Sequence, residues 1–390
     1  MSIAEAEAAG KPGERAPDLL YSEAERDLAG SLRSLLGARC RPEDVLGRLG
    51  GPGQADRPGE TEPYDTVLWK AIAGDLGCAG LLVPEEQDGA GASFREAATV
   101  AEELGRAVAP VPYLGSAVVA TTALLTVGDD LTVRELARGD VTAALAVGSE
   151  SAPGAAFPLT ARVSGPKSSD SRAGVHRLRG RVRGVADALS ADLLIVPSDG
   201  VPHGLYVVGT GVEGVRRTPI VSLDMTRQLC DIDFEDAPAR AIASGAEADR
   251  ALQAALSAGA AAIASEQLGL ADKCLEMTVA YVKERRQFAR PVGSFQGLKH
   301  RLADLWVGLT QARAAADSDA PLAIALAKSY CGDLAVRAAE ECVQMHGGIG
   351  FTWEHPAHLY LKRAKAASIA FGTSDAHRAS LARLADLPGA

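Results

Sequence analysis

The chain has 390 residues, of which 47% are hydrophobic and 23% charged, a composition typical of a soluble globular protein with more than one domain. Its formal net charge of −10 argues against general affinity for nucleic acid or for an acidic membrane surface, because those partners require a broad basic field. The six cysteines show no C-x-x-C spacing and no histidine cluster, so we predict reduced thiols, no metal site and a cytoplasmic location.

Residues 1–20 contain no apolar core of a signal peptide, and we expect them to be a disordered leader. No uninterrupted apolar run reaches the roughly 18 residues that cross a membrane. The sequence therefore indicates neither export nor membrane spanning.

Residues 21–135 predict an N-terminal helical domain. Leu28, Leu32 and Leu35 follow helical spacing in SEAERDLAGSLRSLLGARC. A second helix is expected to run through YDTVLWKAIAGDLGCAGLLVP and to stop at Pro84. The third begins in SFREAATVAEELGRAVAP with the Ser93-x-x-Glu96 pattern of a capping box.

The pattern changes in residues 136–243, where short runs such as ADLLIVPS and GLYVVGT stand between Gly, Pro, Asp and Ser. These runs predict a small central β-barrel or sandwich. Long helical patterns return in residues 244–390, with short connections that favour an antiparallel four-helix bundle. The predicted fold class is α+β, with a helical domain, a β-domain and a helical bundle in chain order.

Two segments of the C-terminal part could bind a phosphorylated ligand. ERRQFARPVGSFQ (284–296) gathers Arg285, Arg286 and Arg290 near a helix end, where guanidiniums can bind phosphate bidentately. The alternative is a solvated helix end, where cations favour the helix dipole. QMHGGIGF (344–351) has three glycines that allow close approach of a flat ligand. Its alternative is an ordinary helix cap and turn.

A third segment, SIAFGTSDAHR (368–378), places Gly-Thr-Ser where a helix begins, a plausible anion cradle. In order and spacing, ERRQFARPVGSFQ, QMHGGIGFTWEHP and FGTS resemble the C-terminal half of the acyl-CoA dehydrogenase family, and LLVPEEQDGAGAS resembles a loop of its N-terminal helices. The resemblance implies FAD bound at a subunit interface and FAD-dependent α,β-dehydrogenation of an acyl thioester, carried by CoA or by an acyl-carrier protein. It also implies a role in lipid metabolism, electron-transfer flavoprotein or another acceptor as partner, and a homo- or hetero-oligomer, either a dimer or a tetramer.

The resemblance assigns FAD contacts residue by residue. Arg285 and Gln296 would hold the pyrophosphate and its surroundings, within the motif that also contains Gln287 and Phe288. The adenine end, reached from an adjacent subunit, would meet Gln344, Met345, His346, Gly347 and Gly348. Thr373 and Ser374 would meet phosphate or ribityl. Two departures stand out: Ala289 replaces the usual glycine, and only SESAPGA (149–155), which keeps Ser149, matches the relatives' flavin-contacting T-E-P-x-A-G-S.

The family's reaction needs a carboxylate that removes the α-proton of the thioester. Many relatives place it directly before Gly-Thr, where this chain has Phe371, whose backbone N–H alone could still polarise the thioester carbonyl. Other relatives place it at the position of Gly259. Glu266 lies seven residues further on the same helix face, so we consider it either the base or one partner of a buried ion pair with an arginine such as Arg285.

Glu354 is the other candidate base, although pairing with Arg363 would explain it better. Three functions stay open at this point. The first is an FAD-dependent acyl-thioester dehydrogenase with Glu266 as base. The second is a non-catalytic subunit that completes the FAD site of a hetero-oligomeric acyl-CoA dehydrogenase. The third is another flavin-dependent oxidation on the same fold.

Overall fold

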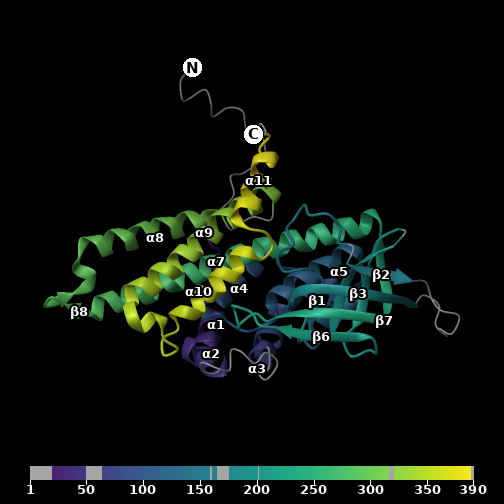
Figure 1. The fold of residues 1–390 in the computed structure, drawn as a ribbon, viewed down its shortest axis with the longest axis horizontal. Helices are drawn as coiled ribbons and strands as arrows, with labels where there is room; N and C mark the ends of the chain where they lie inside the picture. The colour runs from purple at the N-terminus through teal and green to yellow at the C-terminus, as the bar shows by residue number, and fades with distance from the viewer. Residues whose placement is uncertain are drawn as a thin grey trace, which may run out of the picture.

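The computed structural model describes residues 20–49, 64–158, 160–164, 175–200, 202–315 and 320–387. Nearly all of the expected leader, residues 1–20, lies outside this range. Helices come first along the chain, a β-sheet follows, and helices return, which confirms the coarse fold class (Figure 1).

The N-terminal part is helical, with α1 Glu23–Arg39, α2 Pro42–Leu49, α3 Thr66–Lys70, α4 Phe94–Ala107, η5 Tyr113–Ala120, α5 Thr121–Val127 and α6 Asp130–Ala137. Helix α4 starts where the sequence predicted it, because the Ser93 side chain accepts the Arg95 N–H and donates to Glu96. The predicted end of the second helix at Pro84 is wrong. The π-helical turn that continues α3 ends at Asp75, and Gly77 then takes a φ of 67°.

The central part forms a sheet of β1 Ala143–Leu145, β2 Ala161–Ser164, β3 Val175–Ala186, β4 Leu193–Asp199, β5 Gly204–Gly209, β6 Val215–Ile220 and β7 Leu229–Ser244. The pairing runs from β4 through β2, β3, β7 and β5 and returns to β4, so these strands close into a small barrel, with β1 and β6 added at its edges. The predicted β-domain is therefore present as a barrel-like sheet.

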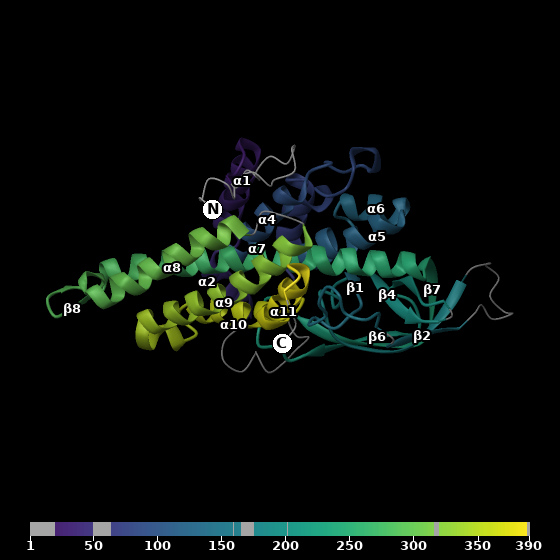
Figure 2. The same cartoon turned by 90° about the horizontal axis from the view of Figure 1, so that it is seen from above.

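The C-terminal part contains α7 Ala246–Glu284, the hairpin β8 Arg286–Gln287 and β9 Arg290–Pro291, α8 Gln296–Ala315, α9 Pro321–His346, α10 Ala357–Ile369 and α11 Ser374–Leu384. Helix α7 is continuous over 39 residues. In both views it runs lengthwise through the molecule, with the β8–β9 hairpin at one end and the sheet at the other (Figures 1 and 2). Helix α11 follows the four helices of the predicted bundle and begins at the Gly-Thr-Ser turn, where the sequence indicated that a helix opens.

Helices α4 and α7 pack with almost no side chain between them. A Cβ at Gly105 would overlap the backbone carbonyl of Glu266, and a Cβ at Gly269 would overlap that of Glu102. Glycine at both positions therefore permits this close approach. It holds the middle of α7, including Glu266, against the N-terminal helices.

Candidate active site

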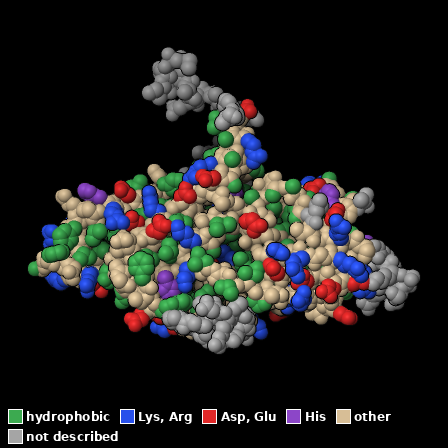
Figure 3. Space-filling view, in the orientation of Figure 1, with side chains coloured by type: hydrophobic (Ala, Val, Ile, Leu, Met, Phe, Trp, Pro, Cys, Tyr) green, Lys and Arg blue, Asp and Glu red, His purple; other side chains and the backbone are tan. Residues whose placement is uncertain are grey.

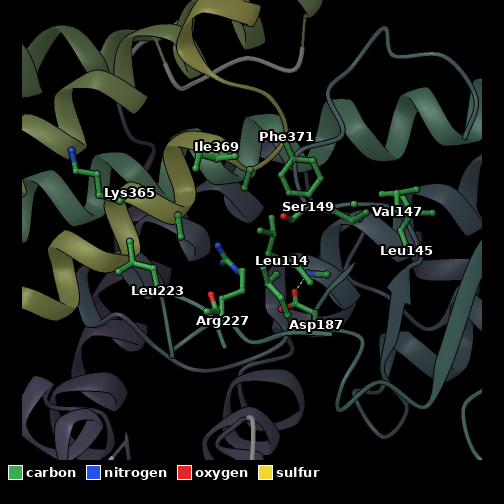
Figure 4. Close-up of a pocket in the computed structure, with 18 residues that line it drawn as sticks. Leu114, Leu145, Val147, Ser149, Asp187, Leu223, Arg227, Lys365, Ile369 and Phe371 are labelled. Atoms are coloured by element: carbon green, nitrogen blue, oxygen red, sulfur yellow. Dashed lines mark hydrogen bonds between the residues drawn. The ribbon is translucent and has the colours of Figure 1, made fainter. Parts of the chain in front are cut away.

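A cavity of about 320 Å³ lies where the N-terminal helices, the sheet and the C-terminal helices meet. Its walls come from η5, from β1 and the segment after it, from the end of β3, from the β6–β7 connection and from the end of α10 (Figure 4). The lining is mostly apolar and includes Leu114, Val119, Leu145, Val147, Leu223, Leu229, Ile369 and Phe371. Asp187, Arg227 and Lys365 are the charged side chains among the lining residues.

The two positions at which the resemblance placed a base, Phe371 and Gly259, lie against each other. The ring of Phe371 packs so closely on Gly259 of α7 that a Cβ at Gly259 would overlap ring atoms. Phe371 takes the left-handed conformation with a φ of 54°, which is unusual for a bulky residue. The Phe371 ring thus occupies the space next to Gly259, and neither position offers a proton acceptor.

The backbone around Phe371 is also occupied. Its N–H donates to the carbonyl oxygen of Ser149 at 2.9 Å, and the Ser149 N–H donates to the Gly184 carbonyl at 3.0 Å. A Cβ added at Gly372 would lie only 2.8 Å from the Ala152 Cβ. The sequence suggested that the Phe371 N–H could polarise a thioester carbonyl, but in the structure Ser149 already accepts this N–H. The 149–155 segment and the Gly-Thr-Ser turn, both predicted to contact flavin, contact each other.

Glu266 belongs to a buried ion cluster. Its carboxylate accepts from Arg227 of the β6–β7 connection, with the Nη2–Oε2 pair at 2.6 Å, and from Arg363 of α10, with Nε–Oε1 at 2.7 Å. Arg363 also contacts Asp224 at 3.2 Å and the Thr226 hydroxyl at 3.0 Å. Three elements that are distant in sequence are thereby joined, and Glu266 does not line the cavity beside Phe371.

These contacts make Glu266 a poor base. Burial by itself would raise the pKa of its carboxyl, but the guanidiniums of Arg227 and Arg363 outweigh that effect and lower the pKa to about 2. The sequence suggested either a base or a buried pair with an arginine such as Arg285. The structure gives the buried pair, but with Arg227 and Arg363 as partners. The expected pairing of Arg363 with Glu354 is wrong, because Glu266 and Asp224 neutralise Arg363.

The arginine segment lies at the far end of the molecule. Arg285 caps α7, Gln287 lies in β8 and Gln296 opens α8, and all three are exposed, as is Phe288 with 86% of its surface accessible. Ala289 occupies the usual glycine position and, like Phe288, has a positive φ, 63°. The hairpin therefore keeps a conformation suited to glycine in spite of the substitution.

The predicted adenine-contacting segment ends α9 near this hairpin. Gln344 and Gly348 are exposed, and Met345 and Gly347 are partly exposed. The side chain of His346 is buried: its Nδ1 is 2.7 Å from the Cys342 carbonyl, and its ring packs on Tyr281 and His355. The segment can offer a ligand Gln344 and glycine backbone, whereas the His346 side chain faces inward.

Thr373 and Ser374 begin α11, as expected for a helix-opening turn. The Thr373 side chain accepts the Ala376 N–H at 3.3 Å, while Ser374 is buried against Gly332. Gly372 takes a φ of 96°. The Thr373 hydroxyl thus caps α11, and the turn also contacts the 149–155 segment through Phe371 and Gly372.

Sequence reasoning missed Asp224, Arg227 and Asp187. The Asp187 Oδ1 accepts from the Tyr64 hydroxyl and its Oδ2 from the Gly115 N–H at 2.9 Å. Asp224 and Arg227 meet partners from 39 to 139 residues away. Their sequence separation shows why no local motif revealed them. Across the described ranges, no trio of His, Cys, Asp or Glu is grouped to hold a metal ion, and no helix has the length and apolarity to traverse a bilayer.

Comparison with known proteins gives the class. Residues 52–138 match the family model for the acyl-CoA dehydrogenase N-terminal domain, and residues 249–385 match that for the C-terminal domain. The chain is 36% identical over 305 residues to the acyl-CoA dehydrogenase IpdE2 of Mycolicibacterium smegmatis, covering 77% of this chain and 82% of that protein.

Two solved structures share the fold. One is the ChsE4–ChsE5 complex from Mycobacterium tuberculosis, with a TM-score of 0.80 and 25% identity over 96% of this chain and 100% of that one. The other is a glutaryl-CoA dehydrogenase from Mycobacterium smegmatis in complex with FADH2, with a TM-score of 0.78 and 21% identity over 94% of this chain and 95% of that one.

The fold and the matches define an oxidoreductase flavoprotein, a class in which FAD is the cofactor. The chain belongs to the acyl-CoA dehydrogenase family. This confirms the family and enzyme class that the sequence motifs indicated.

The residues present fit FAD at the exposed hairpin. The exposed arginines and glycines around the hairpin offer the cations and open backbone that a pyrophosphate and a planar ring require. Beside the cavity, the Phe371 N–H donates to Ser149 and Gly372 packs closely on Ala152, so these backbone groups already have partners within the protein. The groups that remain open to FAD lie at the hairpin.

Proposed function

We propose that this chain serves acyl-CoA dehydrogenation as the subunit that completes the FAD site of a partner chain in a hetero-oligomer, and that it does not supply the base itself. The observation that carries the proposal is the distance between two parts of this chain, the cavity end at Phe371 and the hairpin end at Arg285. Phe371 contacts Gly259, and Gly259 and Arg285 are 26 residues apart on one continuous helix, about 39 Å at 1.5 Å per residue. A flavin ring and its own pyrophosphate lie much closer together than that.

Arg285, Gln296, Gln344 and Gly348 would therefore hold the pyrophosphate and adenine of a cofactor whose ring lies in another chain. FAD supplies the hydride acceptor when it is bound. The residues of this chain contribute charge neutralisation by guanidinium and close backbone approach by glycine. The partner would provide the carboxylate and receive the acyl-CoA. Electron-transfer flavoprotein or a comparable acceptor would reoxidise the assembly, and the assembly would be a dimer or tetramer.

Two further features support a non-catalytic role. The carboxylate suggested as base is neutralised by two arginines, and the family's base positions are an aromatic ring and a glycine in contact. The ChsE4–ChsE5 complex provides a precedent for a heteromeric assembly on this fold. A self-sufficient dehydrogenase would need a proton acceptor beside the flavin ring, and neither Phe371 nor Gly259 offers one.

The test compares the full chain alone with the chain co-purified with a flavin-carrying family member from the same organism. We expect the chain alone to lack a flavin spectrum, and the complex to contain fewer FAD molecules than chains. Arg285→Ala should lower FAD retention by the complex, whereas the exposed Arg179→Ala should not. The proposal fails if the chain alone carries one FAD per chain and an acyl-CoA bleaches that flavin anaerobically.

A further inference from the structure

Two of the buried cysteines contact each other where α7 and α9 pack side by side (Figures 1 and 2). Cys274 of α7 and Cys342 of α9 are fully buried, and their thiols are hydrogen-bonded to each other. Both are free thiols. A disulfide forms only between cysteines whose side chains face each other at close range. The pair therefore meets the first requirement for a cross-link between the two helices.

The imidazole of His346 lies beside one member of the pair. Its Nδ1 is 2.7 Å from the carbonyl oxygen of Cys342 and 3.6 Å from the Cys342 Sγ. A carbonyl oxygen can only accept a hydrogen bond, so Nδ1 carries a proton and presents its N–H to the sulfur as well. An N–H next to the sulfur favours the thiolate, which is the nucleophilic form of cysteine.

The surroundings of the two thiols differ. The hydrogen bond from Cys274 lowers the pKa of the Cys342 thiol below its usual range, and the contacts with His346 and Thr278 act in the same direction, against burial. Burial raises the pKa of Cys274 above its usual range. Cys342 is therefore the attacking sulfur, and Cys274 keeps its proton until it resolves the product, an arrangement typical of redox-sensing cysteines.

A layer of rings separates Cys342 from the solvent. The ring of His346 stacks on Tyr281 and on His355, with ring centroids 4.4 Å and 4.3 Å away, and His355 is half-buried. In the half of the molecule that the C-terminal helices form, histidine side chains reach the surface (Figure 3). Small motions of these rings admit a molecule of the size of hydrogen peroxide but exclude one of the size of glutathione.

We propose that Cys274 and Cys342 form a redox-sensitive dithiol, which a hydroperoxide oxidises to a disulfide between α7 and α9. The Cys342 thiolate attacks the peroxide, the O–O bond breaks, and Cys342 becomes a sulfenic acid as hydroxide leaves. The Cys274 thiol then attacks the Cys342 sulfur, the S–O bond breaks, and water leaves as the disulfide forms. Two electrons pass from the thiols to the peroxide, and a thiol reductant reverses the cross-link.

The cross-link would lie one helical turn before the segment that was predicted to contact adenine. Cys342 and His346 lie on consecutive turns of α9, with Gln344 between them. Oxidation replaces the thiolate that faces the His346 N–H by a disulfide sulfur, which is a weaker acceptor. Both cysteines belong to this chain, so the inference does not depend on the proposed FAD-completing role.

The experiment treats the full-length chain with hydrogen peroxide and maps the linked peptides by mass spectrometry without reduction. We expect the native chain to join the peptide of Cys274 to that of Cys342 with the loss of two hydrogens, and dithiothreitol should restore both thiols. Cys274→Ala should instead accumulate Cys342 as a sulfenic acid, detected with dimedone after denaturation. The matched control is Cys331→Ala, on another buried cysteine of α9, which should form the cross-link as the wild type does.

Two comparisons make the result decisive. Burial raises the pKa of Cys331 to about 12, so Cys342 should be oxidised at least about tenfold faster than Cys331 in the same sample. In guanidinium chloride, where the unfolded chain exposes all six cysteines, peroxide should give a mixture of links. The proposal is overturned if the chain, folded by circular dichroism, forms no link between Cys274 and Cys342, if its links are as mixed as in guanidinium chloride, or if Cys331 reacts as fast as Cys342.

Discussion

Replacing Glu266 by Gln tests whether this carboxylate stabilises the fold or acts as the catalytic base. The substitution keeps the shape of the side chain and removes its charge. Arg227 and Arg363 would then be left buried with Asp224 as their remaining carboxylate partner. Breaking one side of a buried ion pair typically costs about 3–5 kcal/mol, because an uncompensated charge stays in the interior.

The pKa of Glu266 gives a similar magnitude. The model-compound value is 4.5 and the folded value is about 2, and this difference corresponds to about 3 kcal/mol of stabilisation. For an acid whose folded pKa is lowered, the stabilisation is fully present above the unfolded pKa and is lost as the pH falls toward the folded one. The wild type should therefore exceed the variant by a constant amount between roughly pH 6 and 8.

The assay is thermal unfolding of the full chain at a fixed scan rate, with Glu340→Gln as the matched control. Glu340 forms an exposed pair with Lys365, which should contribute at most about 1 kcal/mol. At about 2 °C per kcal/mol, Glu266→Gln should lower the Tm by roughly 6–10 °C. A variant that melts like the wild type but has lost an acyl-CoA-dependent reaction would refute this reasoning and restore Glu266 as the base.

Three further changes test the packing around these sites. Lys328 is fully buried, and burial lowers its pKa from 10.5 to about 8. Because the unfolded chain binds more protons in that interval, the stability of the wild type should rise by about 3 kcal/mol between pH 8 and 10.5. Lys328→Met should abolish this rise, as measured by melting curves at alkaline pH. Gly259→Ala should cost about 1–3 kcal/mol by overlap with the Phe371 ring, and a double-mutant cycle with Phe371→Leu should recover most of it; additive losses would contradict the contact. Ala289→Gly should relieve about 1 kcal/mol of left-handed strain, measurable as slower hydrogen exchange in the β8–β9 hairpin, and unchanged exchange would count against that strain.

The order of helices, sheet and helices could be predicted because each element carries a local signal. Ser93 and Glu96 show where α4 begins, and the long stretch without proline shows α7. The end of the second helix could not be placed, because Gly77 and Pro84 are both possible stops and only packing selected the glycine.

The site was predictable only in parts. The sequence identified Phe371 and Gly259 separately as positions without a base, and showed that Glu266 was too costly to bury alone. It did not show that Phe371 and Gly259 touch, or that Arg227 and Arg363 surround Glu266, since those contacts join elements far apart in the chain. Partner choice among charged residues depends on the tertiary structure, which explains why Glu354 was the wrong partner for Arg363.

Helix α7 fixes the distance between the cavity and the β8–β9 hairpin. The same rigid rod carries Gly259 beside the cavity and Arg285 at the exposed hairpin, so the spacing between the two ends is set by residue count alone. Inserting a single residue between them would move the hairpin by about 1.5 Å and turn it by about 100° around the rod. The hairpin arginines would then point in a different direction, and they could no longer contact the same surface of a neighbouring chain.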